Sequence, residues 1–395
     1  MRGRDRAPGD RGGRRRAVRP ARRGGDRRRD PARPGPPRRA GRRRARGRRR
    51  AHLGGHRAGD RRGLPAGARR VSPARTTILV LSVDEAHRLE HSLPAAAVQP
   101  DAEVVVIDNA CTDTTRTVAE RHGARVVALS QRRSYAAAIN AGLAATDGEA
   151  VLLLNADCVL DAGFLAAARP QLDRPGIGSV APRLVRATGM TEAERLEVLD
   201  TAAMAIDRRR KNGLVGHGEP MARRARRAPV FGGDGACVLY RREVLDACAV
   251  GAEVLDEDME LWASDVDLAW RAQLLGYGCT YEPAALAWHV RFYSPTTRSQ
   301  ISPAHRTLQF RNRLLMIAKN DSARSLARDL PRLLLYEVLA LGYAVLRERH
   351  LLRGYRDAYR LLPGARRRRA VLRARMAERG GAAAAPFGLE PPVSP

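Results

Sequence analysis

Short apolar runs alternate with longer amphipathic stretches from about residue 76 to residue 320. The first three runs cover residues 77–83 (TILVLSV), 103–107 (EVVVI) and 124–129 (ARVVAL). Apolar runs of this length, bounded by polar residues, are typical of buried β-strands. Strands that alternate with helices in this way predict an α/β domain with a doubly wound, mostly parallel sheet.

A fourth run, residues 148–160 (GEAVLLLNADCVL), is the centre of the predicted site. Its five consecutive apolar residues are followed by Asn155 and Asp157. In open α/β sheets, ligands bind just beyond the carboxyl ends of the strands, which is where Asp157 would lie. A buried carboxylate is costly unless it is paired or bound to a metal, and Mg²⁺ and Mn²⁺ take oxygen ligands. We therefore expect a metal–diphosphate site at Asp157; the alternative is an aspartate that caps the next helix.

The predicted strand over residues 103–107 also ends in a carboxylate, Asp108. Two successive strands that end in acids predict one shared crevice for Asp108 and Asp157.

Residues 186–228 then break the alternation of strands and helices, because they are rich in arginine and glutamate and show few strand signals. Such an insertion is either a lid or binding loop or a solvated variable loop. Strand character resumes over residues 229–240, around glycines that permit close backbone approach.

An acidic segment opens a helix over residues 264–275. Ser264 and Asp267 have the spacing of a capping box, and Asp267 can pair with Arg271 one turn later. Asp265 has no such structural explanation, so we expect it to face the crevice, where a carboxylate could act as a general base.

Basic and apolar segments follow this helix. Arg311 and Arg313 carry guanidinium groups that suit a diphosphate; the alternative is a helix with solvated arginines. Residues 331–347 predict an apolar helix of about four turns. It is too short to span a bilayer, so it either packs on the domain or lies in a membrane interface.

The charge of the chain is concentrated at its N-terminus. Residues 1–75 contain 29 arginines and 5 aspartates, a formal charge of +24 out of the total of +30. The segment has almost no large apolar residues, so we expect it to be disordered. It is either a basic arm for nucleic acid or an anionic membrane, or an unstructured extension. No interleaved aromatic residues support a specific nucleic-acid module.

The five cysteines are far apart and form no CxxC pair. This pattern predicts reduced thiols and a cytoplasmic protein, with neither a disulfide scaffold nor a zinc site. No signal peptide and no apolar run of bilayer-spanning length is visible.

Five motifs, in order, resemble the family 2 glycosyltransferases of the GT-A fold, in particular the bacterial rhamnosyltransferase-like branch. The motifs are VVVIDNACTDTT (104–115), YAAAINAGLAATDGEAVLLLNADCVLDAGFL (135–165), FGGDGACVLYRREVL (231–245), LDEDMELWASDVDLAWRAQLLGYG (255–278) and RNRLLMIAKN (311–320). Two departures from the family pattern concern the site: Asn155 stands where many members have the first Asp of the metal motif, and Ser264 replaces the usual Glu before the base.

The resemblance implies a role for each matching residue. Asp265 would be the catalytic base, and Asp157 and His289 would hold Mg²⁺ or Mn²⁺. The acceptor side would be formed by Gly233, Asp234 and Gly235. The donor nucleotide sugar would be bound by Asp108, Asn109, Asp113, Asn155, Asp157, Arg311 and Arg313.

The implied activity is inverting, metal-dependent transfer of a sugar from a nucleoside diphosphate sugar, either dTDP-rhamnose-like or a UDP-sugar. The acceptor would be a hydroxyl group of a glycan or lipid-linked molecule in cell-wall or polysaccharide biosynthesis, with peripheral contact at the inner membrane face. A nucleotidyltransferase on a similar fold and a nucleic-acid-binding protein that uses the arginine arm stay open. The expected organisation is a disordered segment (1–75), the GT-A domain (76–320), amphipathic helices (321–378) and a disordered tail (379–395).

Overall fold

The computed structural model describes residues 76–291, 299–380 and 385–393. Four parallel strands lie side by side in one half of a mixed sheet, in the order β4, β1, β2, β3. They are β1 (Thr76–Ser82), β2 (Ala102–Asp108), β3 (Arg125–Ala128) and β4 (Ala150–Asn155). All four correspond to apolar runs that the sequence predicts to be strands.

The other half of the sheet contains antiparallel pairs. β11 (Cys237–Arg241) runs antiparallel to β4 and to β6 (Ile177–Ala187), and β12 (Gly278–His289) runs parallel to β6. Three shorter strands join this half: β5 (Cys158–Leu160), β7 (Arg195–Thr201) and β10 (Ala228–Val230).

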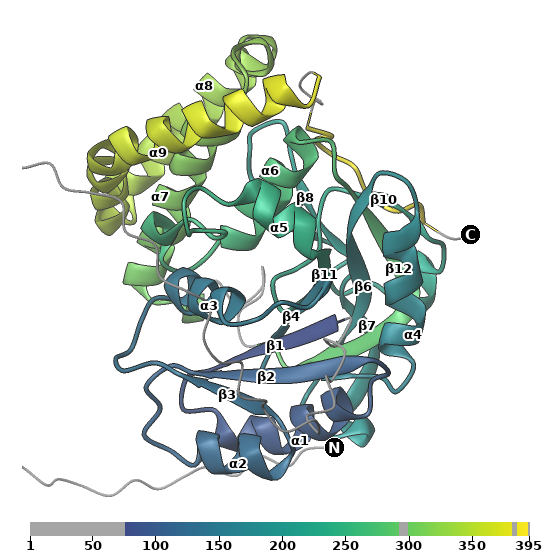
Figure 1. Cartoon of the computed structure of the whole chain (residues 1–395). Coiled ribbons are helices and arrows are strands. Elements are labelled where there is room, and N and C mark those ends of the chain that lie inside the picture. The colour runs from purple at the N-terminus through teal and green to yellow at the C-terminus, as the bar shows by residue number, and fades with distance from the viewer. Residues whose placement is uncertain (1–75, 292–298, 381–384, 394–395) are drawn as a thin grey trace, which may run out of the picture. The chain divides into compact units, whose positions relative to one another are not determined.

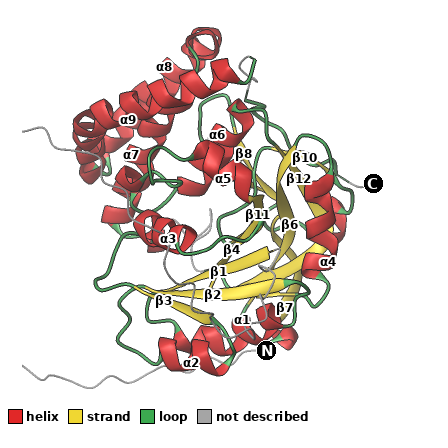
Figure 2. Ribbon diagram, in the orientation of Figure 1, coloured by secondary structure: helices red, strands yellow, loops and turns green. Residues whose placement is uncertain are grey.

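Helices cover both faces of the sheet (Figures 1 and 2). One face packs against α1 (Ala86–Ala97), α2 (Thr115–Arg121) and α4 (Phe164–Ala168). The opposite face packs against α3 (Tyr135–Ala144), α5 (Arg242–Cys248) and α6 (Ser264–Leu274). Three further helices, α7 (Pro303–Asn320), α8 (Ala323–Leu346) and α9 (Leu352–Glu378), lie beyond α6.

Side chains that alternate between the two faces of the buried strands form two hydrophobic cores, one on each side of the sheet. Leu79 and Leu81 of β1 belong to the core under α3, α5 and α6. Ile78 and Val80 of the same strand belong to the core under α1, α2 and α4. Successive side chains of a strand point to opposite faces, so a fully apolar run is what a strand covered on both faces requires. The predicted α/β fold class is confirmed.

Residues 186–228 are not the irregular segment that the sequence indicates, because this insertion contains strands; a binding role for it stays a prediction. Besides β7 it forms the hairpin of β8 (Ala203–Ile206) and β9 (Asn212–Val215). Its arginines gave the sequence the appearance of a solvated loop. Arg210, however, is fully buried, and its guanidinium donates to Asp321 and Asp329 at 2.7 Å. Ion pairs with distant acids let these charged residues lie inside the protein.

Residues 385–393, predicted as part of a disordered tail, have a defined position. The ring of Phe387 lies 5.2 Å from that of Trp270 in α6, and the guanidinium of Arg210 lies 4.5 Å from the Phe387 ring centre. An aromatic side chain that packs on a core helix orders the chain around it. Residues 1–75 and 381–384, also predicted to be disordered, lie outside the described residues. Within the described part, no helix combines the length and the apolarity that crossing a membrane requires.

Candidate active site

The carboxyl ends of β1, β2 and β4 meet at one edge of the sheet. Ser82 at the end of β1 pairs with Asp108 of β2, and Leu81 pairs with Asn155 of β4. Asp108 and Asp157 therefore lie at the same edge, with β1 between them, as predicted.

Asp157 is held against His289, the last residue of β12. The pairing of His289 with Cys158 in β5 brings the imidazole to the end of β4. Its Nε2 lies 3.2 Å from Oδ1 of Asp157, and its Nδ1 lies 2.9 Å from Oδ2 of Asp200. Both His289 and Asp200 are buried. The structure thus brings the two predicted metal ligands together and adds Asp200, at the end of β7, as a second acid on the same imidazole.

The electrostatics of this cluster follow from its buried charges. Burial alone would lower the pKa of His289, but Asp157 and Asp200 raise it well above its ordinary value. Burial alone would raise the pKa of Asp157, but the neighbouring His289 holds it below its usual range. The three groups stabilise one another in their charged forms.

Once the Nε2 proton of His289 is displaced, the donor set at Asp157 and His289 fits a divalent cation. Octahedral ligands about 2.1 Å from an ion are about 3 Å apart when adjacent, and the Nε2–Oδ1 separation is 3.2 Å. A metal-bound imidazole usually donates its other ring N–H to a carboxylate, and Asp200 occupies that position. The geometry is therefore that of two adjacent ligands with a carboxylate that orients the histidine.

Arg291 connects this cluster to the glycine-rich turn before β11. Its Nε donates to both carboxylate oxygens of Asp200, at 2.8 and 2.9 Å, and its Nη2 donates to Oδ2 of Asp234 at 2.7 Å. The backbone N–H of Asn155 donates to the Ala236 carbonyl two residues after Asp234. The predicted acceptor-side turn Gly233, Asp234 and Gly235 thus lies next to the end of β4.

Asp265, the predicted base, lies against the same turn. Its Oδ2 accepts the backbone N–H of Gly235 at 3.0 Å, and its Oδ1 accepts that of Val266 at 2.8 Å. Burial and the nearby charge of Asp234 raise the pKa of Asp265 to about 6. A Cβ at position 235 would lie 3.0 Å from Oδ2 of Asp265, so any larger residue there would have to displace the carboxylate by a few tenths of an ångström. A carboxylate with this pKa can accept a proton near neutral pH.

The loop that precedes Asp265 is strained. Glu260, Trp262 and Ala263 have positive φ angles of 60°, 70° and 61°, a region that side chains other than glycine rarely adopt. The fully buried amide of Asn312 in α7 donates to three carbonyl oxygens of this loop, those of residues 259, 261 and 262, at 2.7–2.9 Å. Arg311 donates to the carbonyls of residues 258 and 259 and to Glu260. This clamp fixes the backbone that carries Asp265.

The capping box predicted at Ser264 is not formed. Residue 263 is the N-cap and makes no side-chain cap, while Asp267 is fully buried, with Arg271 at 2.9 Å and Lys319 at 2.9 Å. The predicted pair of Asp267 and Arg271 is confirmed. Asp267 thus pairs with two buried cations, Arg271 and Lys319 of α7, instead of capping the helix.

Asp108, Asn109 and Asp113 already have partners in the protein. Oδ1 of Asp108 accepts the N–H of residue 111 at 2.8 Å, and its Oδ2 lies 3.4 Å from Arg116. Asn109 bonds the backbone of residue 133 with both its amide oxygen and nitrogen. Asp113 accepts two backbone N–H groups at helix starts. These bonds shape the loop after β2, and a contact of that loop with a nucleotide stays a prediction.

Ligand atoms of Asp84, Cys111 and Asp113 come within 4.8 Å of one another. Each already takes part in the loop, however. Asp84 accepts from Thr112 and Arg132, and Sγ of Cys111 accepts the N–H of residue 84. Hydrogen bonds thus account for this cluster without an ion.

Arg311 and Arg313 point into the protein and not toward solvent. Arg313 donates to Glu337 of α8 and stacks 4.5 Å from the ring centre of Tyr336. Both guanidinium groups are buried and have structural roles, so the alternative of a solvated helix face is wrong. Their predicted contact with a diphosphate stays untested.

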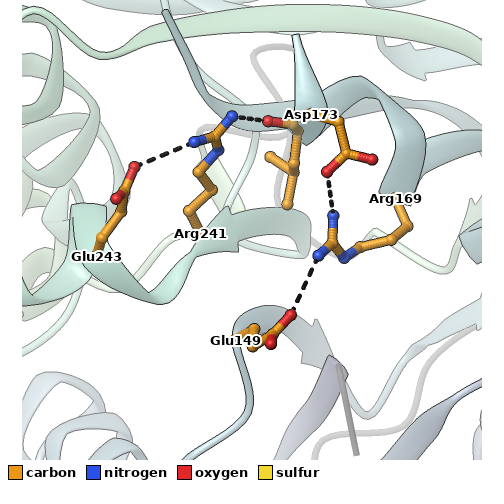
Figure 3. A pocket seen from close by; sticks show the side chains of 6 residues that line it. Glu149, Arg169, Asp173, Arg241 and Glu243 are labelled. Atoms are coloured by element: carbon orange, nitrogen blue, oxygen red, sulfur yellow. Dashed lines mark hydrogen bonds and ion pairs between the residues drawn. The ribbon is translucent and has the colours of Figure 1, made fainter. Parts of the chain in front are cut away.

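A pocket of about 500 Å³ lies at the opposite end of β4 from Asp157 (Figure 3). Arg169 bridges Glu149 at 3.5 Å and Asp173 at 3.0 Å, and Arg241 lies 3.2 Å from Glu243. Its charged groups are paired with one another, and it is at the amino end of β4, where open α/β sheets do not place their ligands. The candidate site is therefore the carboxyl edge.

Three residues of the site were not predicted: Asp200, Arg291 and Asn312. Asp200 lies in the insertion over residues 186–228. Residues 196–200 (LEVLD) resemble the end of β2, because apolar residues are followed by an acid, and this similarity is the sequence signal for Asp200. Arg291 and Asn312 bond to residues that are distant in the sequence, so their roles can be identified only in the folded structure.

Comparison with known proteins finds a family that part of the chain matches. Residues 77–248 match the family described as Glycosyl transferase family 2. Uncharacterised glycosyltransferases of Mycobacterium tuberculosis and Mycobacterium bovis are 36% identical over 138 residues, which cover 30% of this chain and 63% of theirs. The chain therefore spans less than two thirds of the length of these relatives. The poly-β-1,6-N-acetyl-D-glucosamine synthase of Staphylococcus epidermidis is 23% identical over 197 residues, 48% of this chain and 43% of that protein.

Among solved structures, a mannosyltransferase of Pyrobaculum calidifontis in complex with GDP-Man and Mn²⁺ is similar at 20% identity. The TM-score is 0.44, and the alignment covers 78% of this chain and 88% of that one. Residues 1–349 of S. aureus TarS, in complex with UDP, align at 15% identity with a TM-score of 0.47, covering 77% and 88% of the two chains.

Proposed function

Because residues 77–248 belong to glycosyl transferase family 2, we propose that the protein transfers a sugar from a nucleoside diphosphate sugar to a hydroxyl group of an acceptor. The observation that carries the proposal is the continuous line of contacts from Asp157 through His289, Asp200, Arg291 and Asp234 to the turn that holds Asp265. It joins a pair of metal-type ligands to a half-buried carboxylate of raised pKa. Transfer from a nucleotide sugar needs both, the first at the leaving group and the second at the nucleophile.

Asp157 and His289 would hold Mg²⁺ or Mn²⁺ at the diphosphate. When bound, such an ion offsets the negative charge that develops on the leaving diphosphate. Asp200 would fix the ring orientation of His289, with its Nδ1 proton directed at the carboxylate. Asn155, in the position of the first acid of the metal motif, would leave this site with fewer carboxylates than many family members have.

Asp265 would take the proton of the acceptor hydroxyl as its oxygen attacks the anomeric carbon. We propose inversion at that carbon, which follows from direct attack with a single base. A pKa of about 6 leaves Asp265 ionised at neutral pH and basic enough to assist. Asp234, which accepts from Arg291, contributes to the raised pKa of Asp265.

The donor would be dTDP-rhamnose-like or a UDP-sugar, with Asp108 at the base of the nucleotide. The acceptor would be a glycan or a lipid-linked molecule in cell-wall or polysaccharide synthesis, reached at the inner face of a membrane. The basic, apolar helices of residues 321–378 support such a location.

The test compares two variants against a panel of nucleoside diphosphate sugars. Asp265→Asn should retain metal-dependent nucleotide binding and lose about 10²–10⁴-fold in transfer rate. Asp157→Ala should weaken nucleotide binding in the presence of Mn²⁺ and leave metal-free binding unchanged. Asp265→Asn turnover equal to that of the parent would refute the role of the base. Release of pyrophosphate from a nucleoside triphosphate would instead indicate a nucleotidyltransferase.

A further inference from the structure

The outer face of α8 is apolar and exposed. Eight large apolar side chains between Leu330 and Leu346 have exposed fractions of 44–81%. They are Leu330, Leu334, Leu335, Val338, Leu339, Leu341, Val345 and Leu346. Over these residues the helix is about 24 Å long, at 1.5 Å per residue. Contiguous apolar surface of this size on a folded domain marks a contact with a partner or a membrane.

Buried ion pairs fix which side of α8 faces outward. Asp329 is fully buried and accepts from Arg208 at 2.7 Å and from Arg210 at 2.7 Å. Eight residues further along α8, Glu337 accepts from Arg313 of α7 at 2.5 Å. Rotation of the helix to hide its leucines would break both anchors and leave buried charges unpaired. The apolar face is therefore held toward the outside, on the side of the α7–α9 layer away from the sheet (Figure 1).

The exposed charge of α8 and α9 is almost entirely positive. Between residues 323 and 378, all of which the structure describes, every exposed charged side chain is an arginine except Glu378, the last residue of α9. The arginines are Arg324, Arg328, Arg332, Arg347, Arg349, Arg353, Arg356, Arg360, Arg366 and Arg367. The other acids of the same stretch, Asp329, Glu337, Glu348 and Asp357, are buried or half-buried. The arginines stand at both ends of the apolar stretch, with none between Arg332 and Arg347.

We propose that the α8 face docks in the plane of an anionic lipid surface, with its leucines in the acyl boundary and the flanking arginines on the headgroups. Apolar insertion combined with attraction to anionic lipid is the way amphipathic helices bind membranes. A second copy of the chain fits less well. Two α8 faces packed antiparallel would bring Arg324 and Arg328 of one copy to Arg347 of the other, and the nearby acids are already engaged inside.

Docking through α8 also sets the height of the active site above the lipid. Glu337 of α8 holds Arg313, whose neighbours on α7, Arg311 and Asn312, clamp the loop before Asp265. The base is therefore connected to the lipid-facing helix through one rigid helix. That connection suits a lipid-linked acceptor, and this part of the inference rests on the proposed function.

The experiment is co-sedimentation of the full chain with phosphatidylcholine vesicles, with and without phosphatidylglycerol. The variant is Leu335→Glu combined with Val338→Glu, both on the exposed face. The matched control is Val98→Glu, because Val98 and Val338 are both 68% exposed and Val98 follows α1, outside the proposed face. Residues 1–75 are present in all three proteins, so their charge contributes equally.

We expect the parent and Val98→Glu to bind anionic vesicles alike, and the double variant to bind at least about ten-fold more weakly. Replacing one flanking arginine, for example Arg332→Gln, should weaken binding about five-fold. Equal binding by all three proteins would mean that the N-terminal arginines bind the lipid, and no binding by the parent would mean that α8 has another occupant; either overturns the proposal. A parent dimer that the double variant converts to monomer, without vesicle binding, also overturns it in favour of a second copy.

A separate experiment measures metal-dependent binding of the nucleotide sugar in the absence of vesicles, which tests the proposed function independently of the docking. Nucleotide-sugar binding without vesicle binding means that only the docking is wrong. Vesicle binding without nucleotide-sugar binding means that only the proposed function is wrong.

Discussion

Replacement of Asp265 by asparagine should change the pH dependence of stability in a defined direction. Asp265 is half-buried beside Asp234, and its pKa rises from 3.8 to about 6 in the folded protein. Between these values the folded state binds a proton that the unfolded state has released. The free energy of unfolding of the parent therefore falls as the pH rises through this interval.

The size of the effect follows from the two pKa values. At about 1.4 kcal/mol per pH unit, the interval corresponds to about 3 kcal/mol. Asparagine does not titrate, so the variant should gain about 3 kcal/mol relative to the parent between pH 4 and pH 6, with a constant difference above about pH 7. The variant also loses one acceptor for the N–H of Gly235 or Val266, at a cost of about 1–3 kcal/mol that does not depend on pH. The change of the difference with pH, and not its value at one pH, is thus the diagnostic quantity.

Urea unfolding of both proteins at several pH values between 4 and 8, with a chelator present, measures this difference. The matched control is Asp173→Asn, the same chemical change at a carboxylate whose side chain is 72% exposed, which measures the effect of the substitution at the protein surface. A flat difference for Asp265→Asn, or one that grows as the pH falls, would show that the burial and charge environment assigned to Asp265 is wrong. The predicted result pairs a rise of the variant's relative stability between pH 4 and pH 6 with the loss of transfer, as expected when a site holds an unfavourable charge for function.

Three further predictions concern the groups around Asp157 and Asp265. Asp200→Asn should weaken metal affinity about 10–100-fold, measured by Mn²⁺ titration, because His289 loses its orienting acid; unchanged affinity contradicts that role. Gly235→Ala should lower the transfer rate with little change in nucleotide-sugar affinity, since the new Cβ meets Oδ2 of Asp265 at 3.0 Å; steady-state kinetics separate the two. Asn312→Ala should leave three loop carbonyls without their donor and lower both the melting temperature and the transfer rate, whereas a lower melting temperature with normal transfer would limit Asn312 to stability.

The strands, and the acids that come just after them, can be predicted from the sequence for a physical reason. β1, β2 and β4 are covered on both faces, so their runs are apolar throughout, and the chain becomes polar where the strand reaches the ligand edge. Asp108 and Asp157 stand out because each comes just after such a run. Asp265 stands out only beside the predicted capping box at Ser264, which the structure does not form. Information of this kind is local, and a single sequence contains it.

Buried charge pairs carry no local signal. Arg210 and Arg313 look like solvent-exposed arginines in the sequence, but their partners Asp321, Asp329 and Glu337 come from another part of the chain. The same holds for Arg291, whose partners are Asp200 and Asp234. Whether an arginine binds a ligand or an internal acid depends on which acids the fold brings to it, and that is decided only when the tertiary structure forms.

The order of charges along the active-site edge accounts for the raised pKa of Asp265. Asp157, His289, Asp200, Arg291 and Asp234 alternate in sign, so each member has an opposite charge beside it. Asp265 comes after Asp234 and receives only two backbone N–H groups, which stabilise its charge less than a guanidinium would. A cation placed beside Asp265 would lower its pKa and its basicity. The alternation therefore keeps the metal-side acids ionised and leaves the proton acceptor at the end of the series poised near neutral pH.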